Sequence, residues 1–284
     1  MTLVFHSIAE VQQWVGEARN QGGTVALVPT MGSLHEGHLA LVREAQQRAS
    51  HVVVSIFVNP LQFGPAEDLK NYPRDLSGDV ARLSHLGTSA VFAPGVEEMY
   101  PGGPSATRVT VEGMSGVLCG RTRPTHFQGV TTVVAKLFHI VRPDVAVFGE
   151  KDWQQLAIIR RMVRDLNFGI DIVGVPIVRE SSGLARSSRN QYLTAEDRSR
   201  AQALSRALEG ARVAYLEGER RREVLRSCVL QTLRDAGLNP EYVEVVEPET
   251  LEQSPEALRG PAVIALAVRV GAARLIDNVI LGRS

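Results

Sequence analysis

Short apolar runs separated by amphipathic segments are the feature that most narrows the folds open to this 284-residue chain. The clearest run, Val52-Val-Val-Ser-Ile-Phe-Val58, is apolar at every position except Ser55, rather than apolar at alternate residues. A strand of this kind needs cover on both faces, and helices packed on the two sides of a parallel sheet provide it. The sequence therefore predicts strands that alternate with helices around a parallel sheet.

The alternation continues through the first 178 residues. Helical periodicity and Gly or Pro punctuation predict helices at 8–18, 38–50, 76–86, 129–141 and 152–166, and strands at 24–28, 52–58, 90–93, 145–148 and 170–178. This order is typical of a doubly wound, Rossmann-like α/β fold.

The composition changes after residue 178. Two Arg- and Glu-rich helical stretches, 195–218 and 220–236, are followed by strand-like segments at 242–246, 262–268 and 273–277. We therefore expect a Rossmann-like domain over 1–178 that binds the substrates. A smaller α+β domain over 179–284, with a mainly antiparallel sheet, is expected to act as a lid.

Charge and cysteine usage exclude several classes of protein. Lys plus Arg (31) balance Asp plus Glu (31), so no overall field attracts nucleic acid or an anionic membrane. Cys119 and Cys228 fit no disulfide framework or zinc motif, which favours a reducing cytoplasm. The first ten residues lack a signal-peptide pattern, and no apolar run approaches 18 residues. We expect a cytoplasmic protein with no bound metal or prosthetic group and no nucleic-acid or membrane partner.

The densest motif, Pro29-Thr-Met-Gly-Ser-Leu-His-Glu-Gly-His38, lies where a predicted strand gives way to a helix. Helix N-termini bind phosphates through unpaired N–H groups, and Gly32 and Gly37 let a ligand approach the backbone. His35 and His38 are three residues apart, so both can donate hydrogen bonds to phosphate oxygens. The spacing alone is equally consistent with half of a metal site or a helix cap.

A second segment, Phe57-Val-Asn-Pro-Leu-Gln-Phe-Gly64, follows the next predicted strand. The carboxamides of Asn59 and Gln62 suit recognition of a small hydroxy acid, although they could equally stabilise a turn beside Pro60. Ligands of doubly wound sheets bind at the carboxyl ends of the strands, where this segment is expected to lie.

A third segment, Gly149-Glu-Lys-Asp-Trp-Gln-Gln155, ends another predicted strand and opens a helix. Lys151 offers a charge to phosphates, and Gln155 is expected to face the same cleft. Asp152 could bind ribose hydroxyls or cap the helix.

A fourth segment, Ser181 to Asn190, is rich in glycine, hydroxyl and guanidinium groups at the predicted domain junction. Ser187, Ser188 and Arg189 could close over a triphosphate, and a solvated turn is the alternative.

His35-Glu-Gly-His38 is similar to the HxGH signature of adenylyl-transferring nucleotide-binding proteins, and the segments together resemble the pantothenate synthetase family, ligases that join pantoate to β-alanine. The resemblance rests on the four segments above and on Tyr72-Pro-Arg-Asp75, His126-Phe127, Gly129-Val130 and Leu275-Ile-Asp-Asn278. Arg186, Thr125 and Trp153 depart from the family pattern, and none of these departures removes a group proposed for catalysis.

The resemblance implies a set of site residues. The implied ATP contacts are Met31, Gly32, Ser33, Leu34, His35, Glu36, Gly37, His38, Gly149, Glu150, Lys151, Asp152, Val178, Arg186, Ser187, Ser188 and Arg189. Gln62, Gln155 and Asn59 are expected to contact the acid substrates, and His38, His35, Lys151 and Arg189 to carry the catalysis. Mg²⁺ would bind to the phosphates, and the enzyme would be a homodimer.

The implied reaction has two steps, in which ATP and pantoate give pantoyl adenylate and pyrophosphate, and β-alanine then displaces AMP. Because the carboxylate is already ionised at neutral pH, the first step needs positioning and charge neutralisation rather than a base. We therefore expect His38 to act mainly as a hydrogen-bond donor, although the family usually assigns it as proton donor. Gln62 and Gln155 disfavour two other hypotheses, a nucleotidyltransferase that keeps the adenylate and a nucleotide-binding regulatory module without turnover.

Overall fold

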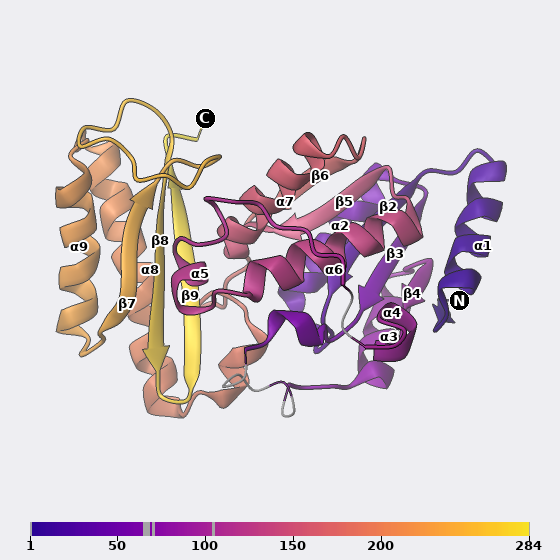
Figure 1. Cartoon of the computed structure of the whole chain (residues 1–284). Helices are drawn as coiled ribbons and strands as arrows, with labels where there is room; N and C mark the ends of the chain where they lie inside the picture. The colour runs from indigo at the N-terminus through magenta and orange to yellow at the C-terminus, as the bar shows by residue number, and fades with distance from the viewer. Residues whose placement is uncertain (1, 65–68, 70–71, 104–105, 284) are drawn as a thin grey trace.

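The computed structural model of this chain describes residues 2–64, 69, 72–103 and 106–283. These residues form a six-stranded parallel sheet and a three-stranded antiparallel sheet, each with its own helices, and the two parts lie side by side (Figure 1). The larger part is built from β1 (Leu3–Phe5), α1 (Ile8–Asn20), β2 (Val25–Thr30), α2 (Glu36–Arg48), β3 (His51–Ile56), η1 (Pro60–Gln62), α3 (Leu76–His85), β4 (Ala90–Phe92), α4 (Val96–Met99), α5 (Cys119–Thr122), α6 (His126–Val141), β5 (Val145–Gly149), η2 (Glu150–Asp152), α7 (Trp153–Asp165) and β6 (Asp171–Val175). The short helix η3 (Ser188–Tyr192) leads into the smaller part, which contains α8 (Ala195–Leu216), α9 (Arg222–Asp235), β7 (Pro240–Val246), β8 (Ala262–Val270) and β9 (Ala273–Leu281).

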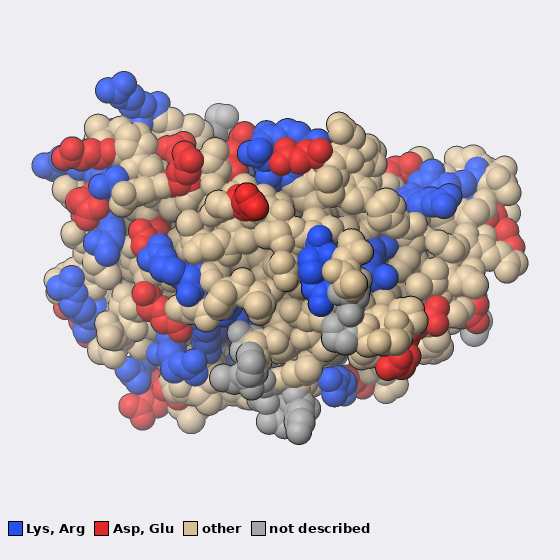
Figure 2. Space-filling model, viewed as in Figure 1, with Lys and Arg blue, Asp and Glu red and all other residues tan. Residues whose placement is uncertain are grey.

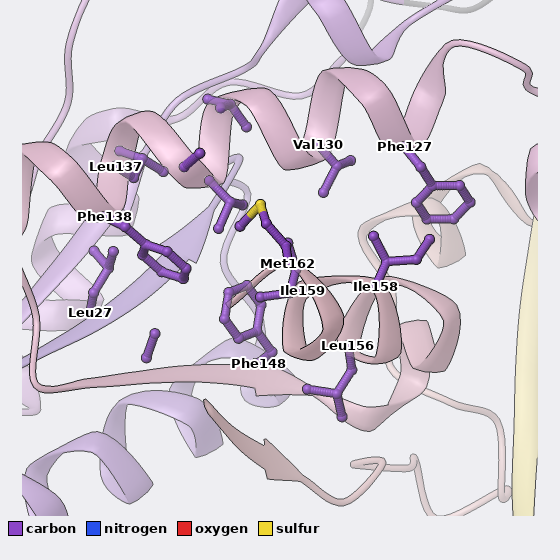
Figure 3. Close-up of a cluster of buried hydrophobic side chains, with 14 of the residues drawn as sticks. Leu27, Phe127, Val130, Leu137, Phe138, Phe148, Leu156, Ile158, Ile159 and Met162 are labelled. Carbon is purple, nitrogen blue, oxygen red and sulfur yellow. The ribbon is translucent and has the colours of Figure 1, made fainter. Parts of the chain in front are cut away.

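Helices cover both faces of the parallel sheet, whose strand order is β1-β4-β3-β2-β5-β6. Strand β2 shows the alternation: Val25 and Leu27 pack toward α1, α6 and α7, and Ala26 and Val28 pack toward α2. Figure 3 shows side chains of α6 and α7 meeting Leu27 and the β5 residue Phe148 in one apolar cluster. The predicted doubly wound parallel sheet is confirmed.

The sequence missed strand β1, which pairs in parallel with β4 at the edge of the sheet. It has only three residues, and Leu3 and Val4 are exposed, so neither its length nor its burial gives a periodic signal. The second helix also starts two residues earlier than predicted, at Glu36, because His35 caps it.

The smaller part contains the expected antiparallel sheet, in the order β7-β8-β9. Helices α8 and α9 cover one face, where Ile264 and Leu266 of β8 join their core. From the opposite face Val263 and Ala265 join the core of the larger part, so β8 is buried on both sides. The boundary between 178 and 179 and the lid function stay predictions.

Charges of both signs are interspersed over the face of the molecule seen in Figure 2, with no broad region of one sign. Within the described ranges, no helix has both the length and the apolar character needed to span a membrane.

Candidate active site

The central strands β2 and β5 are neighbours, and the next strand along the chain lies on opposite sides of this pair. Strand β3 pairs with β2 on one side, and β6 pairs with β5 on the other. Such a topological switch point opens a crevice at the carboxyl ends of the strands. The 31–38 loop leaves β2 there, and the 149–152 turn leaves β5 beside it. Two adjoining cavities lie at this edge, with volumes of about 230 and 500 Å³. The proximity predicted for the two motifs is confirmed, since both line the smaller cavity.

His35 and His38 form a stacked pair at the start of α2, with ring centroids 4.1 Å apart. Nδ1 of His35 accepts a hydrogen bond from the Gly37 amide at 3.1 Å, and Nδ1 of His38 accepts one from the His35 amide at 3.3 Å. A neutral imidazole that accepts at Nδ1 carries its proton on Nε2. The pair therefore caps the helix with one nitrogen of each ring and keeps an Nε2–H donor on the other.

Both rings are neutral at physiological pH. Burial, then the charges of Lys151 and Arg186, lower the pKa of His35 to about 4. Burial, then His35 and Lys151, lower the pKa of His38 to about 3. Neutral rings with the proton on Nε2 can donate to phosphate oxygens, but they are poorly suited to act as general acids at pH 7.

The loop before the helix is held by a carboxylate that no sequence motif marked. Buried Asp79 of α3 accepts from the Ser33 amide at 2.8 Å and from the Leu34 amide at 2.7 Å. Gly32 and Ser33 both have positive φ, at 83° and 52°, a region in which only glycine is unstrained. Asp79 thus stabilises a strained turn, and Arg82 pairs with it at 3.4 Å.

The two carboxamides of the 57–64 segment have different surroundings. Asn59 is 1% exposed; its NH₂ group donates to the Gln62 side chain and the Gly129 carbonyl, and its oxygen accepts from Tyr100 Oη and the Leu61 amide. All four of its hydrogen-bonding positions are thus used within the protein. Asn59 positions Gln62, in keeping with the turn-stabilising alternative, and its contact with substrate stays a prediction.

Gln62 lies on the wall of the smaller cavity together with Gln155 and Met31. Its Nε2 is 2.7 Å from the sulfur of Met31, and its backbone oxygen accepts from His126 Nδ1 at 2.9 Å. Gln155 lines both cavities from the first turn of α7. The structure therefore brings the two glutamines to one cavity, as expected from their positions after two strands of the parallel sheet.

The 149–152 turn presents its side chains in opposite directions. Lys151 and Asp152 line both cavities, and Asp152 makes no capping hydrogen bond although it occupies the N-cap position of α7. Glu150 is 3% exposed, and its carboxylate pairs with Arg283 at 2.6 Å. The side chain of Glu150 is thus turned away from the cavities, Glu150 lines neither of them, and its contact with ATP stays a prediction.

The 178–189 segment forms the remaining wall. Val178, Arg186, Ser187, Ser188 and Arg189 all line the smaller cavity, and their contact with a triphosphate stays a prediction. The Arg186 amide donates to the Val178 carbonyl at 2.9 Å, and Nε of Arg186 is buried with no hydrogen-bond partner. A buried donor without a partner is costly, and an anionic ligand is one group that could satisfy it.

Four residues that were not assigned to the site from sequence line both cavities: Phe63, Tyr72, Arg123 and His126. Each lies in or near one of the segments that resemble the family, and this position is the sequence feature that could have pointed to it. Burial raises the pKa of Tyr72, which stays a hydroxyl donor at neutral pH.

The charge of the smaller cavity suits a polyanion. Among the described residues that line it, Arg123, Lys151, Arg186 and Arg189 are cationic, and Asp152 is the carboxylate. Within the described part of the chain no group of three or more His, Cys, Asp or Glu side chains has the arrangement of a metal site. Both Nδ1 atoms of the histidine pair are already engaged, so the structure gives no support to half of a metal site there.

Comparison with known proteins agrees with this geometry. Residues 3–280 match the family model described as pantoate-beta-alanine ligase. The chain is 52% identical over 282 residues to pantothenate synthetase from Pelotomaculum thermopropionicum, with 99% of each chain covered. It is 53% identical to the Myxococcus xanthus enzyme of the same name, with 98% and 96% covered.

Solved structures give the same result. The pantothenate synthetase of Thermus thermophilus matches with a TM-score of 0.92 and 48% identity, covering 98% of this chain and 99% of that one. The pantoate-beta-alanine ligase of Francisella tularensis, solved in complex with beta-gamma ATP and β-alanine, matches with a TM-score of 0.81 and 32% identity, covering 99% and 98%.

Proposed function

The chain belongs to the pantoate-beta-alanine ligase family and is an enzyme of this type, and from this we propose that it condenses pantoate with β-alanine through a pantoyl adenylate. In the first step the pantoate carboxylate forms a bond to the α-phosphorus of ATP while the bond to pyrophosphate breaks. In the second step the β-alanine amine bonds to the acyl carbon, the acyl–phosphate bond breaks, and AMP leaves. The amine proton passes to solvent, and no covalent enzyme intermediate is required.

The observation that carries the proposal is the neutral His35–His38 pair beside a cationic cavity wall. The carboxylate needs no base because it is ionised at neutral pH. The barrier instead comes from charge that develops at the α-phosphate, and fixed N–H donors stabilise such charge. We assign Nε2–H of His35 and His38 to this role, and Lys151 and Arg189 to neutralising the departing pyrophosphate.

The acid substrates are assigned to the wall formed by Gln62, Gln155 and Met31. Carboxamides can bind hydroxyl and carboxylate groups without adding charge. Support comes from the position of this wall beside the histidine pair and from the complex of the Francisella tularensis ligase with beta-gamma ATP and β-alanine.

Three further features belong to the proposal. Mg²⁺ would bind the phosphate oxygens, with the carboxylate of Asp152 as the nearby protein oxygen donor, and would add charge neutralisation. The segment around Ser187 to Arg189, with the smaller domain, would close over the adenylate and exclude water. A cytoplasmic homodimer is retained from the family resemblance; Cys119 and Cys228 are free thiols, in keeping with a reducing compartment.

The test is to incubate the protein with MgATP, pantoate and β-alanine and to identify the nucleotide product. AMP and pyrophosphate, formed only when pantoate is present, are expected. Formation of ADP would contradict an adenylate intermediate. Release of free pantoyl adenylate with no requirement for β-alanine would instead indicate a nucleotidyltransferase.

A further inference from the structure

A buried asparagine of the smaller part of the molecule reaches the turn that carries Lys151. Asn278, on β9, is 4% exposed. Its side-chain nitrogen donates to the carbonyl oxygens of Glu150 and Lys151, each at 2.9 Å. We infer that Asn278 is a positioning residue for Lys151, an inference that rests on the proposed function of that lysine.

The two carbonyl groups lie outside the hydrogen-bond ladder of the following α-helix. They belong to the short 3₁₀ helix η2 (Glu150–Asp152), and helix α7 begins only at Trp153. Buried backbone carbonyls without a hydrogen bond are rare and costly. Because carbonyl oxygens only accept, the NH₂ group of Asn278 must face them, and its two N–H donors match the two acceptors.

Asn278 is itself held in place by its neighbour. The carboxylate of Asp277 accepts from the backbone N–H of Asn278 at 2.8 Å. The same carboxylate forms a bidentate pair with Arg179 at 2.7 and 2.9 Å. Arg179 lies in the segment that leads to the Ser187–Arg189 wall of the cavity. A continuous set of contacts therefore joins this segment, strand β9 and the turn of Lys151.

A second contact ties the same turn to the C-terminal residues. Arg283, just after β9, pairs with the buried carboxylate of Glu150 at 2.6 Å. Glu150 is thus held through its backbone by Asn278 and through its side chain by Arg283. The smaller part therefore does more than cover the cleft, because it sets the backbone on which Lys151 is mounted.

The test is a double-mutant cycle with Asn278→Ala and Lys151→Ala, measured as AMP formed from ATP, pantoate and β-alanine. Small displacements of a catalytic group can cost on the order of 10²-fold in rate, so Asn278→Ala is expected to lower kcat/KM for ATP by about 10- to 100-fold. In the Lys151→Ala background the same substitution should change the rate by less than about twofold, because there is no lysine left to position. A merely structural role would not produce this loss of additivity.

Glu244→Gln is the matched control. It removes an ion pair to Arg121 at 3.2 Å that joins the same two parts of the molecule but does not touch the 149–152 turn. Its activity should stay within about twofold of the parent. If Asn278→Ala does not fold at the assay temperature, Asn278→Ser, which also lacks the amide donors, replaces it in the cycle.

The outcomes separate the inference from the proposed function. Additive losses, or an Asn278 variant that folds and keeps the full kcat/KM, would overturn the positioning role while leaving the ligase reaction intact. Full activity of Lys151→Ala alone would overturn both the proposed role of Lys151 and the inference built on it.

Discussion

Replacing His38 by Asn and by Gln separates its two hydrogen bonds. Its Nδ1 accepts from the His35 amide at 3.3 Å, and its Nε2–H is the group assigned to the α-phosphate. The side-chain oxygen of Asn reaches about as far as Nδ1, so His38→Asn keeps the cap and loses the donor. The longer side chain of Gln places an N–H near the position of Nε2, so His38→Gln keeps a donor.

The expected sizes follow from the kind of bond that is lost. A hydrogen bond to a charged group contributes about 1.5–3 kcal/mol, so His38→Asn should lower kcat/KM in the adenylation step by roughly 10- to 150-fold. His38→Gln should lose less than about tenfold. Because the cap survives in His38→Asn, its free energy of unfolding should fall by less than about 1 kcal/mol.

The assay is pantoate-dependent exchange of labelled pyrophosphate into ATP, which isolates the first step from attack by β-alanine. Thermal unfolding of the same preparations is the control for folding. The reasoning would be refuted if His38→Gln lost as much activity as His38→Asn. It would also be refuted if the rate of the parent enzyme followed the titration of a group near the ordinary histidine pKa of about 6.5 that disappears in His38→Gln, because a general acid or base would then be acting.

Other substitutions test the surroundings of the site. The pKa values of His35 and His38 lie near 4 and 3, below the unfolded value of about 6.5, so the unfolded chain binds more protons than the folded chain between these limits. The free energy of unfolding should therefore fall as pH drops from about 6.5 to 4. Denaturant unfolding at a series of pH values should show a smaller fall for His38→Asn than for the parent. Asp79→Asn replaces one of the oxygens that accept from two backbone amides, which should cost about 1–3 kcal/mol and raise KM for ATP, whereas unchanged steady-state kinetics and stability would contradict its role. In Gly129→Ala the new Cβ would lie 2.3 Å from the Leu61 carbonyl oxygen, so a loss of at least about 1–3 kcal/mol is expected, and an unaltered melting temperature would argue against this packing.

The position of candidate residues at one edge of the sheet was predicted where these residues lie within a few residues of a strand end. Lys151 and Gln155 follow β5, and Gln62 follows β3, and parallel strands deliver such residues to one edge of the sheet. Periodicity does not give the order of the strands in the sheet. In a doubly wound sheet, however, the segments that follow the strands beside the topological switch point lie together at the carboxyl edge. This is why a local pattern was enough to assemble most of the cavity wall.

Roles that depend on distant partners could not be predicted. Asn59 was expected to contact substrate or to stabilise a turn, and its contacts with Tyr100 and Gly129 arise only on folding. Its contact with substrate stays a prediction. Asp79 carried no signal, because its partners are backbone amides 45 and 46 residues earlier in the chain.

The sequence by itself determined the alternation of helix and strand, the parallel sheet and the segments that end at its active edge, because periodicity and punctuation are local properties. The spacing of His35 and His38 left open whether they bind metal, cap a helix or donate to phosphate, and the family resemblance favoured donation to phosphate. Only the tertiary structure decided that they cap the helix through Nδ1 and are kept neutral with a proton on Nε2, because burial and the charge of Lys151 act across elements. The tertiary structure likewise placed Asn278 against the turn of Lys151, 127 residues away in sequence, where packing of two separate sheets makes the contact.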